Sequence, residues 1–418
     1  MKEYFQSFRA RSGLWVLIAN ISAKILGFLS VLIVTRLCTE SEFGMYTYAM
    51  NLVSAMVPLM GFGAFQAFLR FSADVGGQLH KKELYKYSFE KALFITLLLV
   101  LILQITADWW CTSIPESATS FRILSFLLIT TLWMEYVKSY ARAIHLNIVS
   151  ARIDLTYALS LLGLSLLLTN LVGVHGYALA VVLSPVVAIV LYLRLVDLRQ
   201  IQRRLTNVRS GAFWSYGIFT SLGAILNQFF YAADIILIGY FAADAAVDVA
   251  IYRVSIIIPM ASLVLPSAIA STDFMQNALR KNDKGVLKNY ISNYWKTFGL
   301  LSLIVLSTIS LLAPHLLSIF GENYIAGSEI MRIYLMGSLG AHLLRVPFGN
   351  LLSAVGKASW NTYINAVVLL LTFFLCGALL PLYGVKGAAI AMTIMMWLSG
   401  MLNAGAFWWY WRGLQGNF

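Results

Sequence analysis

Apolar segments of membrane-spanning length recur along this chain and are separated by short polar turns. Residues 155–193 contain no Asp, Glu, Lys or Arg, and the sequence Gly-Val-His-Gly at 173–176 divides them in two. A helix needs roughly 20 apolar residues to cross a hydrocarbon core of about 30 Å, so this stretch alone predicts two crossings. Backbone groups in lipid must be hydrogen-bonded internally, which a helix achieves within one segment. The sequence therefore predicts an all-α polytopic membrane protein.

The proportion of charged residues supports this class. Of the 418 residues, 60% are hydrophobic and 11% are charged, whereas a soluble domain carries about 25% charged residues. We expect twelve spans, joined by loops too short to hold a soluble catalytic domain. The expected spans are 13–36, 43–70, 92–107, 120–145, 151–170, 174–193, 212–240, 247–271, 295–320, 328–352, 360–382 and 385–411.

Lysine and arginine gather in alternate loops, and this sets the predicted orientation. Cytoplasmic loops carry the excess of Lys and Arg in membrane proteins, so both termini are expected in the cytoplasm. The same distribution accounts for the net charge of +12 and the pI near 9.5, which argues for a membrane-lipid environment and against a nucleic-acid partner. The basic loops are 2–11, 70–91, 199–209 and 280–288.

Two weakly similar halves indicate an internal duplication. The pattern R-x4-N-x2-S-A occurs at 142–151 and again 203 residues later at 345–354, and Gly173-Val-His-Gly recurs as Gly384-Val-Lys-Gly. Each half holds six expected spans, so both share one orientation, as in transporters built from parallel repeats. We expect six-helix lobes at 1–205 and 206–418, with a substrate site between them and alternating access by rocking.

Ionisable side chains within the expected spans are the candidate functional residues. Such side chains are costly in lipid and mark substrate or ion pathways. The candidates are Lys24 in the first span; Glu135, Lys138 and Arg142 in the fourth; Asp154 in the fifth; Asp234 in the seventh; Arg253 in the eighth; and His342 and Arg345 in the tenth.

Glu135, Lys138 and Arg142 recur at helical spacing and therefore share one face of the fourth span. Two interpretations stay open. Either Glu135 and Lys138 neutralise each other as a salt bridge, or the face is a cationic wall whose acid carries a proton. Asp154 is a further candidate for ion coupling or gating.

Arg142 and Arg345 occupy matching positions of the repeat at the offset of 203. They are either snorkelling anchors near the cytoplasmic boundary or a symmetric pair at an entrance. In the second case each planar guanidinium would bind a phosphate with two hydrogen bonds.

Asp234, Arg253 and His342 each allow two interpretations. Asp234 and Arg253 lie toward the outer ends of adjacent antiparallel spans, where they either pair or act separately, as an ion-coupling acid and an anion-binding arginine. His342 is more often a packed, hydrogen-bonded side chain, although the titration range of histidine suits a proton relay.

No motif points to catalysis, a metal or a cofactor. Three cysteines, Cys38, Cys111 and Cys376, are too few and too scattered for a metal site or a disulfide framework. A nucleotide-binding Gly-Lys-Ser/Thr loop and a nucleophilic triad are both missing from the sequence. We therefore expect a transporter rather than an enzyme, without cofactor, driven by an ion gradient or by the gradient of its own substrate.

Three stretches resemble the Wzx-type O-antigen and polysaccharide flippases of the multidrug/oligosaccharidyl-lipid/polysaccharide (MOP) exporter superfamily. They are TRLCTESEFGMY at 35–46, NLLSAVGK at 350–357 and GVKGAAIA at 384–391. The resemblance covers essentially the whole chain. Many relatives carry Leu-Gly after the arginine that matches Arg36, where this chain has Leu37-Cys38.

The resemblance implies a MATE-like, V-shaped bundle of two six-helix lobes around a cationic cavity. It also implies the cargo, an undecaprenyl-pyrophosphate-linked oligosaccharide such as the O-antigen unit of lipopolysaccharide. The cargo would be flipped from the cytoplasmic to the periplasmic leaflet of a bacterial inner membrane. The candidate partners are H+ or Na+ as a coupling ion, a polysaccharide polymerase and a chain-length regulator.

Basic residues on the first and eighth helices serve the pyrophosphate in related lipid flippases, and Lys24 and Arg253 lie on those helices here. The repeat places Asn227 or Gln228 at the depth of Lys24. We expect Lys24 to hold phosphate and the two amides to meet neutral sugar or close a gate.

Two other functions compete with this one. An ion-coupled multidrug exporter of the same fold often takes cationic cargo, so acids should dominate its cavity, whereas cations dominate the candidate set here. A membrane polysaccharide polymerase or ligase typically needs a large outer loop, and the outer loops here are short.

Overall fold

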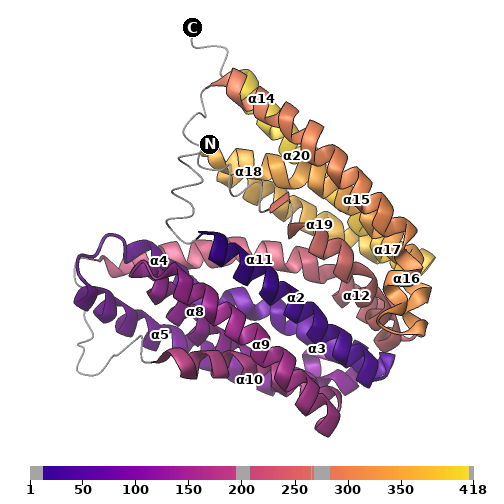
Figure 1. The fold of residues 1–418 in the computed structure, drawn as a ribbon, viewed down its shortest axis with the longest axis horizontal. Coiled ribbons are helices and arrows are strands. Elements are labelled where there is room, and N and C mark those ends of the chain that lie inside the picture. Colours follow the sequence, from indigo (N-terminus) through magenta and orange to yellow (C-terminus); the bar gives the residue numbers. More distant parts are fainter. Residues whose placement is uncertain (1–12, 194–207, 265, 268–282, 414–418) are drawn as a thin grey trace. The chain divides into compact units, whose positions relative to one another are not determined.

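A computed structural model of the chain describes residues 13–193, 208–264, 266–267 and 283–413 (Figure 1). All regular elements within these ranges are helices. They form two compact units, Met1–Gln228 and Phe229–Phe418. The expected lobe boundary between residues 205 and 206 lies outside the described ranges and stays a prediction.

The first unit is built from helices that pack lengthwise along one another. Helix α2 packs along α9, and α9 packs along α10. The elements are α2 Gly13–Leu37, α3 Glu40–Met56, η1 Val57–Gly63, α4 Ala64–Phe71, α5 Gln78–Ile105, α6 Ala107–Trp110, η2 Pro115–Ser117, α7 Ala118–Ser125, α8 Leu127–Ala143, α9 Asn147–Val172 and α10 Val174–Tyr192.

Helix α11, Ser210–Phe241, begins in the first unit and continues into the second. In the second unit, α17 and α19 both pack against α20. The other elements are α12 Ala245–Ser262, α14 Lys284–Tyr294, η4 Trp295–Gly299, α15 Leu300–Leu311, α16 Ala313–Ser318, η5 Glu322–Gly327, α17 Ser328–Gly340, η6 Ala341–Arg345, α18 Val346–Ala354, α19 Ala358–Tyr383 and α20 Val385–Gly413.

Ten helical segments among the described residues are long and apolar enough to cross a membrane, and each overlaps one expected span. The two remaining expected spans, 13–36 and 328–352, are also helical but fall outside these ten. The fold class is confirmed, and the count of twelve spans stays a prediction.

Two helices begin well before the spans expected on them. The third span was expected to begin at residue 92, but α5 begins at Gln78, and the ninth was expected at 295, but α14 begins at Lys284. The early turns of α5 are rich in Lys, Glu and Leu, which are good helix formers, and α14 begins at an N-cap where Asp283 accepts a hydrogen bond from the Val286 N–H. Polarity marks the lipid boundary and does not mark the helix end.

The internal repeat is visible in the backbone. The turn between α9 and α10 has Gly173 at φ +65° and ψ −144°, and the turn between α19 and α20 has Gly384 at φ +59° and ψ −147°. Three residues further on, a Cβ at Gly176 would lie 1.9 Å from the carbonyl oxygen of Leu168, so only glycine fits this close crossing. Gly387 meets Leu379 in the same way, at 2.3 Å.

Helix ends show that the offset of 203 expected for Arg142 and Arg345 was wrong. Helix α8 ends at Ala143 and α18 at Ala354, and the next helices begin at Asn147 and Ala358, an offset of 211 in both cases. Arg142 is therefore next to the end of its helix, whereas Arg345 lies nine residues before the end, about 12 Å deeper by helical rise. The shared pattern R-x4-N-x2-S-A therefore aligns segments whose depths along their helices differ by about two turns. The two arginines are not a symmetric pair.

The expected second span, 43–70, is interrupted. Between α3 and α4, Gly61, Phe62 and Gly63 have φ of +54°, +46° and +68°, which breaks the helix. The freed backbone groups find partners on other helices: the Gly61 N–H donates to Thr96 Oγ1 at 3.0 Å, and Ser221 Oγ donates to the carbonyl of Pro58. Pro58 and two glycines within an apolar span were the sequence signal for this break.

Substitution of Gly217 tests how tightly α11 packs against the break. A Cβ at Gly217 would lie 2.7 Å from the carbonyl oxygen of Phe62. We expect Gly217→Ala to destabilise the protein by about 1–3 kcal/mol, as overpacking does in well-packed cores. The matched control is Gly223→Ala on the same helix, where an added Cβ meets nothing within 4 Å. Thermal unfolding in detergent measures both, and equal melting temperatures for the two variants would contradict this packing.

An aromatic cluster fixes the helices around the break. Tyr85 of α5 makes ring contacts with Phe68 of α4 at 5.6 Å and with Tyr136 and Tyr140 of α8 at 5.3 and 5.8 Å. All four side chains are buried. Aromatic edge-to-face pairs of this kind add to the burial of large apolar areas. The cluster therefore holds α8 in one rotation, which directs its charged residues to a fixed place.

Candidate functional site

Lys138 forms two ion pairs inside the first unit. The side chain is 7% exposed on α8, and its Nζ lies 2.7 Å from Glu135 Oε1, one turn earlier on the same helix. The same Nζ lies 2.7 Å from Asp154 Oδ1 on α9. These three residues, here called the Lys138 cluster, contain one positive and two negative groups when all are ionised. The expected salt bridge between Glu135 and Lys138 is present. Asp154 is a second partner of Lys138, which was not expected from the sequence.

The composition of the Lys138 cluster changes what Lys138 can do. Two carboxylates within 3 Å already balance its charge, so it has little attraction left for an anionic ligand. The second carboxylate leaves a surplus of one negative charge in the cluster, which attracts a further cation. The cluster is therefore suited to bind a cation.

Arg142 lies one turn beyond this cluster, where α8 ends. Its Nε donates to Ser150 Oγ on α9 at 3.1 Å, and the side chain is half-buried. The contact ties the end of one helix to the start of the next.

Asp234 is the most deeply buried acid among the described residues of the second unit. It is 1% exposed, and it accepts hydrogen bonds from the Tyr252 hydroxyl and from the Ile235 backbone N–H, both at 2.8 Å. Arg253 acts on Asp234 electrostatically, but an ion pair between them is not among those of the described residues. Two hydrogen-bond donors, not an arginine fork, hold this carboxylate.

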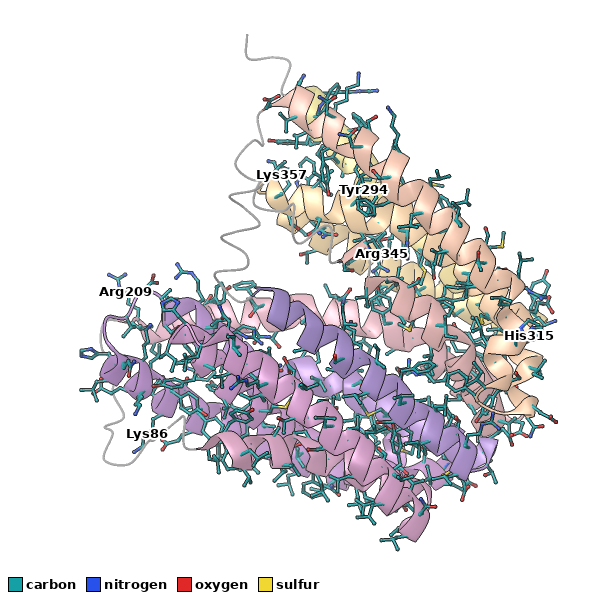
Figure 2. The ribbon with its side chains drawn as sticks, in the orientation of Figure 1. Lys86, Arg209, Tyr294, His315, Arg345 and Lys357 are labelled. Carbon is teal, nitrogen blue, oxygen red and sulfur yellow. The ribbon has the colours of Figure 1, made fainter. Side chains whose placement is uncertain are left out.

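Arg345 is a buried cation without a carboxylate partner in the described part of the chain. It is 9% exposed, and its guanidinium lies over the rings of Phe230 at 4.1 Å and Tyr231 at 5.2 Å. Its Nη1 has no hydrogen-bond partner among the described residues. The residue closes the π-helical turn Ala341–Arg345 of the second unit, where it is labelled in Figure 2. Stacking on ring faces orients the guanidinium and leaves Nη1 available to a ligand.

Tyr334 links these groups into one site. Its hydroxyl is buried without a hydrogen-bond partner among the described residues, and it interacts electrostatically with Asp234, Arg253 and Arg345. These four residues, here called the Arg345 cluster, contain two cations and one acid. With Arg253 half-buried, the Arg345 cluster has a net positive charge when all its charged groups are ionised, opposite in sign to the Lys138 cluster.

The repeat relates the two clusters. At the offset of 211, Arg345 corresponds to Met134, directly before Glu135. The helices α7 and α17 begin at an offset of 210, and the π-helical turn accounts for the extra residue. The duplicated element therefore carries acid in one unit and arginine in the other at nearly the same position.

Both ring nitrogens of His342 have hydrogen-bond partners. Its Nδ1 lies 2.9 Å from Ser302 Oγ and its Nε2 3.1 Å from Ser262 Oγ, and the side chain is 2% exposed. Its backbone carbonyl accepts a hydrogen bond from Tyr294 at 2.8 Å. Serine partners on both ring nitrogens favour the packed interpretation over a proton relay, because neither partner titrates near neutral pH.

Lys24, Asn227 and Gln228 are less enclosed than the two clusters. Lys24 is exposed on a face of α2 that also presents Ile21 and Ile25. It lies thirteen residues before the end of α2, and Gln228 lies thirteen residues before the end of α11, which supports the expected equivalence of depth. Asn227 is exposed and Gln228 half-buried.

Comparison with known proteins identifies the fold and the family. A family model described as "Polysaccharide biosynthesis protein" matches residues 10–273, and one described as MatE matches residues 220–377. The teichuronic acid biosynthesis protein TuaB of Bacillus subtilis (strain 168) is 27% identical over 162 residues. That alignment covers 38% of this chain and 33% of TuaB, so it spans about a third of the curated relative.

Solved structures of low sequence identity share the fold. The lipid II flippase MurJ in an inward closed conformation has a TM-score of 0.79 at 14% identity, over 94% of this chain and 87% of that chain. An inward-facing multidrug resistance MATE family transporter of the MOP superfamily has a TM-score of 0.78 at 14% identity, over 94% and 96%. The expected resemblance to the MOP superfamily is thereby confirmed, and the chain belongs to the polysaccharide biosynthesis protein family.

Proposed function

We propose that this protein is a flippase for a lipid-linked oligosaccharide with an anionic headgroup. The cargo would be an undecaprenyl-pyrophosphate-linked repeat unit of O-antigen or a similar polysaccharide. It would move by alternating access from the cytoplasmic to the periplasmic leaflet of a bacterial inner membrane, with both termini of the protein in the cytoplasm. The family match, the partial match to TuaB and the shared fold of the lipid II flippase MurJ support the cargo class.

The observation that carries the proposal is Arg345, a buried guanidinium that forms no ion pair within the described part of the chain. Burying an uncompensated cation costs several kcal/mol, and a bound pyrophosphate would repay that cost through charge-assisted hydrogen bonds. Arg253 and the Tyr334 hydroxyl would add donors around the same anion. Asp234, the acid of the Arg345 cluster, accepts a hydrogen bond from the Tyr252 hydroxyl and would not compete with the anion for these donors.

The Lys138 cluster suggests how transport is driven. Its surplus negative charge would attract H+ or Na+, so Glu135 and Asp154 are the proposed coupling residues, with Asp234 a further acid of this kind. Lys138 is then the fixed counter-ion of the coupling site, and we no longer propose it as a substrate-binding residue. His342 is likewise proposed as a packing residue, and Arg142 as a tie between α8 and α9.

Lys24 keeps its proposed role as a phosphate ligand, with Asn227 and Gln228 meeting sugar or closing a gate. An ammonium in the middle of a span is tolerated where water or a polar ligand reaches it, and Lys24 is exposed rather than paired. A polysaccharide polymerase and a chain-length regulator remain the proposed protein partners.

A multidrug exporter of the same fold is the second candidate. The MatE model match and the acidic surplus of the Lys138 cluster favour it, because exporters of cationic drugs need buried acid. The net positive Arg345 cluster disfavours it.

Reconstituted liposomes distinguish the two functions. Purified full-length protein is incorporated with a fluorescent undecaprenyl-pyrophosphate-linked oligosaccharide, and a lectin added outside measures its appearance in the outer leaflet. We expect movement well above that of protein-free vesicles, and no uptake of a cationic dye such as ethidium. Dye transport without lipid movement would overturn the flippase proposal.

Lys24→Ala tests the proposed ligand in the first span. We expect a loss of lipid movement of about tenfold or more, since a charge-assisted hydrogen bond is worth roughly 1.5–3 kcal/mol, while the amount of folded protein stays the same. Lys24→Arg keeps the positive charge and should retain most activity. Normal flipping by Lys24→Ala would remove Lys24 from the substrate path.

A further inference from the structure

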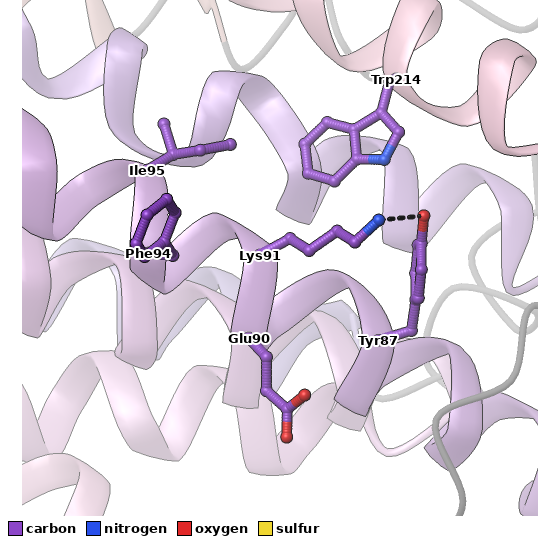
Figure 3. A pocket seen from close by; sticks show the side chains of 6 residues that line it. All are labelled: Tyr87, Glu90, Lys91, Phe94, Ile95 and Trp214. Carbon is purple, nitrogen blue, oxygen red and sulfur yellow. Dashed lines mark hydrogen bonds between the residues drawn. The ribbon is translucent and has the colours of Figure 1, made fainter.

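A cavity of about 560 Å³ lies within the first unit between α5 and the first turns of α11 (Figure 3). It is separate from both charged clusters, and none of its residues was among the candidates from the sequence. Its lining changes from polar to apolar along α5. The lining residues are Tyr87, Glu90, Lys91, Phe94, Ile95 and Trp214.

The polar end of this cavity gathers hydrogen-bond donors from two helices. Lys91 Nζ donates to the Tyr87 hydroxyl at 2.8 Å and lies 4.3 Å from the centre of the Tyr87 ring. The same hydroxyl lies 3.1 Å from Ser210 Oγ of α11. Trp214 of α11 lines the same end of the cavity. An ammonium has three donors, so Lys91 can hold an anion without giving up Tyr87.

The apolar end opens onto a stripe of exposed side chains along α5. Phe94 is 63% exposed and begins this stripe, which repeats at helical spacing. Its members are Phe94, Leu97, Leu98, Leu101, Ile102 and Ile105. Exposed apolar side chains in such a row face lipid, and the change to Lys91 and Lys86 marks the edge of the hydrocarbon. The cavity therefore lies where a headgroup meets its acyl chains.

We propose that this cavity binds an anionic phospholipid of the bilayer. Its phosphate would accept hydrogen bonds from Lys91 and the Tyr87 and Trp214 side chains, and its acyl chain would lie along Phe94 and the stripe below. Basic pockets between spans on the cytoplasmic side commonly take anionic headgroups. Lys91 is the one cation among the lining residues, so a singly charged phosphodiester fits better than a pyrophosphate.

The bound lipid would join two helices that the chain connects only distantly. Tyr87 and Lys91 belong to α5, whereas Ser210 and Trp214 belong to α11. Helix α11 is the helix that continues into the second unit. A lipid at its first turns would stabilise the start of that helix against α5, independently of what the protein transports.

Titration of the full-length protein in detergent with dioctanoyl-phosphatidylglycerol tests the site, with the rise in melting temperature as the signal. We expect saturable stabilisation of the wild type, and a half-saturating concentration about tenfold higher for Lys91→Met, from the loss of a charge-assisted hydrogen bond. Lys82→Met is the matched control on the same helix, because it removes the same charge outside the cavity, and it should bind as the wild type does. Lys91→Arg should retain binding.

Three results would overturn the assignment. Equal affinity of Lys91→Met and wild type would show that Lys91 does not hold the phosphate. Equal stabilisation by dioctanoyl-phosphatidylcholine would show that negative charge is not recognised. Tighter, Lys91-dependent binding of farnesyl pyrophosphate would make the cavity a site for the polyprenyl substrate rather than for a bilayer phospholipid. Inorganic phosphate alone should give no stabilisation, because it has no chain to occupy the apolar end.

Discussion

Replacing Lys138 with methionine is expected to cause a large loss of stability. The substitution leaves Glu135 and Asp154 with no counter-ion between them, although the side chain keeps its apolar length. Breaking a buried ion pair by removing one partner costs about 3–5 kcal/mol. We expect the lower end of this range, because the Glu135 and Asp154 side chains are 19% and 25% exposed. Thermal unfolding in detergent and the yield of monodisperse protein measure the loss.

Matched variants separate the charge from the shape of this side chain. Lys138→Arg keeps the charge and should retain most of the stability. The triple variant Lys138→Met, Glu135→Gln, Asp154→Asn removes all three charges and should recover most of what Lys138→Met loses, since neutral groups of similar shape carry no charge-burial cost.

A Lys138→Met protein as stable as the wild type would show that the cluster is not a charge-balanced unit.

Replacing Arg345 with methionine should have the opposite profile, with a large effect on transport and a small one on stability. The guanidinium has no acid to leave unpaired, so its removal costs mainly the stacking on Phe230 and Tyr231, about 1–2 kcal/mol. The loss of a bidentate contact to a phosphate should reduce lipid movement about tenfold to a hundredfold, the equivalent of roughly 1.5–3 kcal/mol. The liposome assay with the fluorescent lipid-linked oligosaccharide measures the transport.

Two controls make the Arg345 result specific. Arg332→Met removes an exposed arginine from α17, whose Nε bonds the Ser310 carbonyl, and it should leave transport unchanged. Arg345→Lys keeps the charge but loses the planar fork, so intermediate transport is expected. Unfolding of Arg345→Met, or full transport by it, would show that Arg345 is a packing residue rather than a ligand for the headgroup.

The sequence was most informative where a property is local. The span-length apolar runs, and the Gly173 and Gly384 turns, can be seen in adjacent letters, and the structure confirms the helices and the repeat. The break at Gly61–Gly63 had its signal in Pro58 and the glycines. It was missed because a mid-span glycine or proline is often accommodated in a continuous helix.

Residue-by-residue matching across the repeat was less secure. The letters around Arg142 and Arg345 align at 203, yet the helix ends align at 211. A short sequence motif can repeat by chance, whereas a turn that needs a glycine at positive φ constrains the sequence more strongly. The turns at Gly173 and Gly384 were therefore the better markers of the register of the repeat. Inserted residues, such as the π-helical turn Ala341–Arg345, shift the offset along the chain.

The sequence by itself determined the membrane class, the duplicated halves and the set of intramembrane charges, because composition and periodicity along one segment suffice for these. Only the tertiary structure decided which charges are balanced. Asp154 reaches Lys138 from another helix, and Tyr252 holds Asp234, whereas Arg345 stacks on rings and pairs with no acid of the described ranges. Those outcomes depend on the rotation and depth of neighbouring helices. Packing of buried side chains, such as Tyr85 against Tyr136, sets these two quantities, and spacing along one chain segment does not.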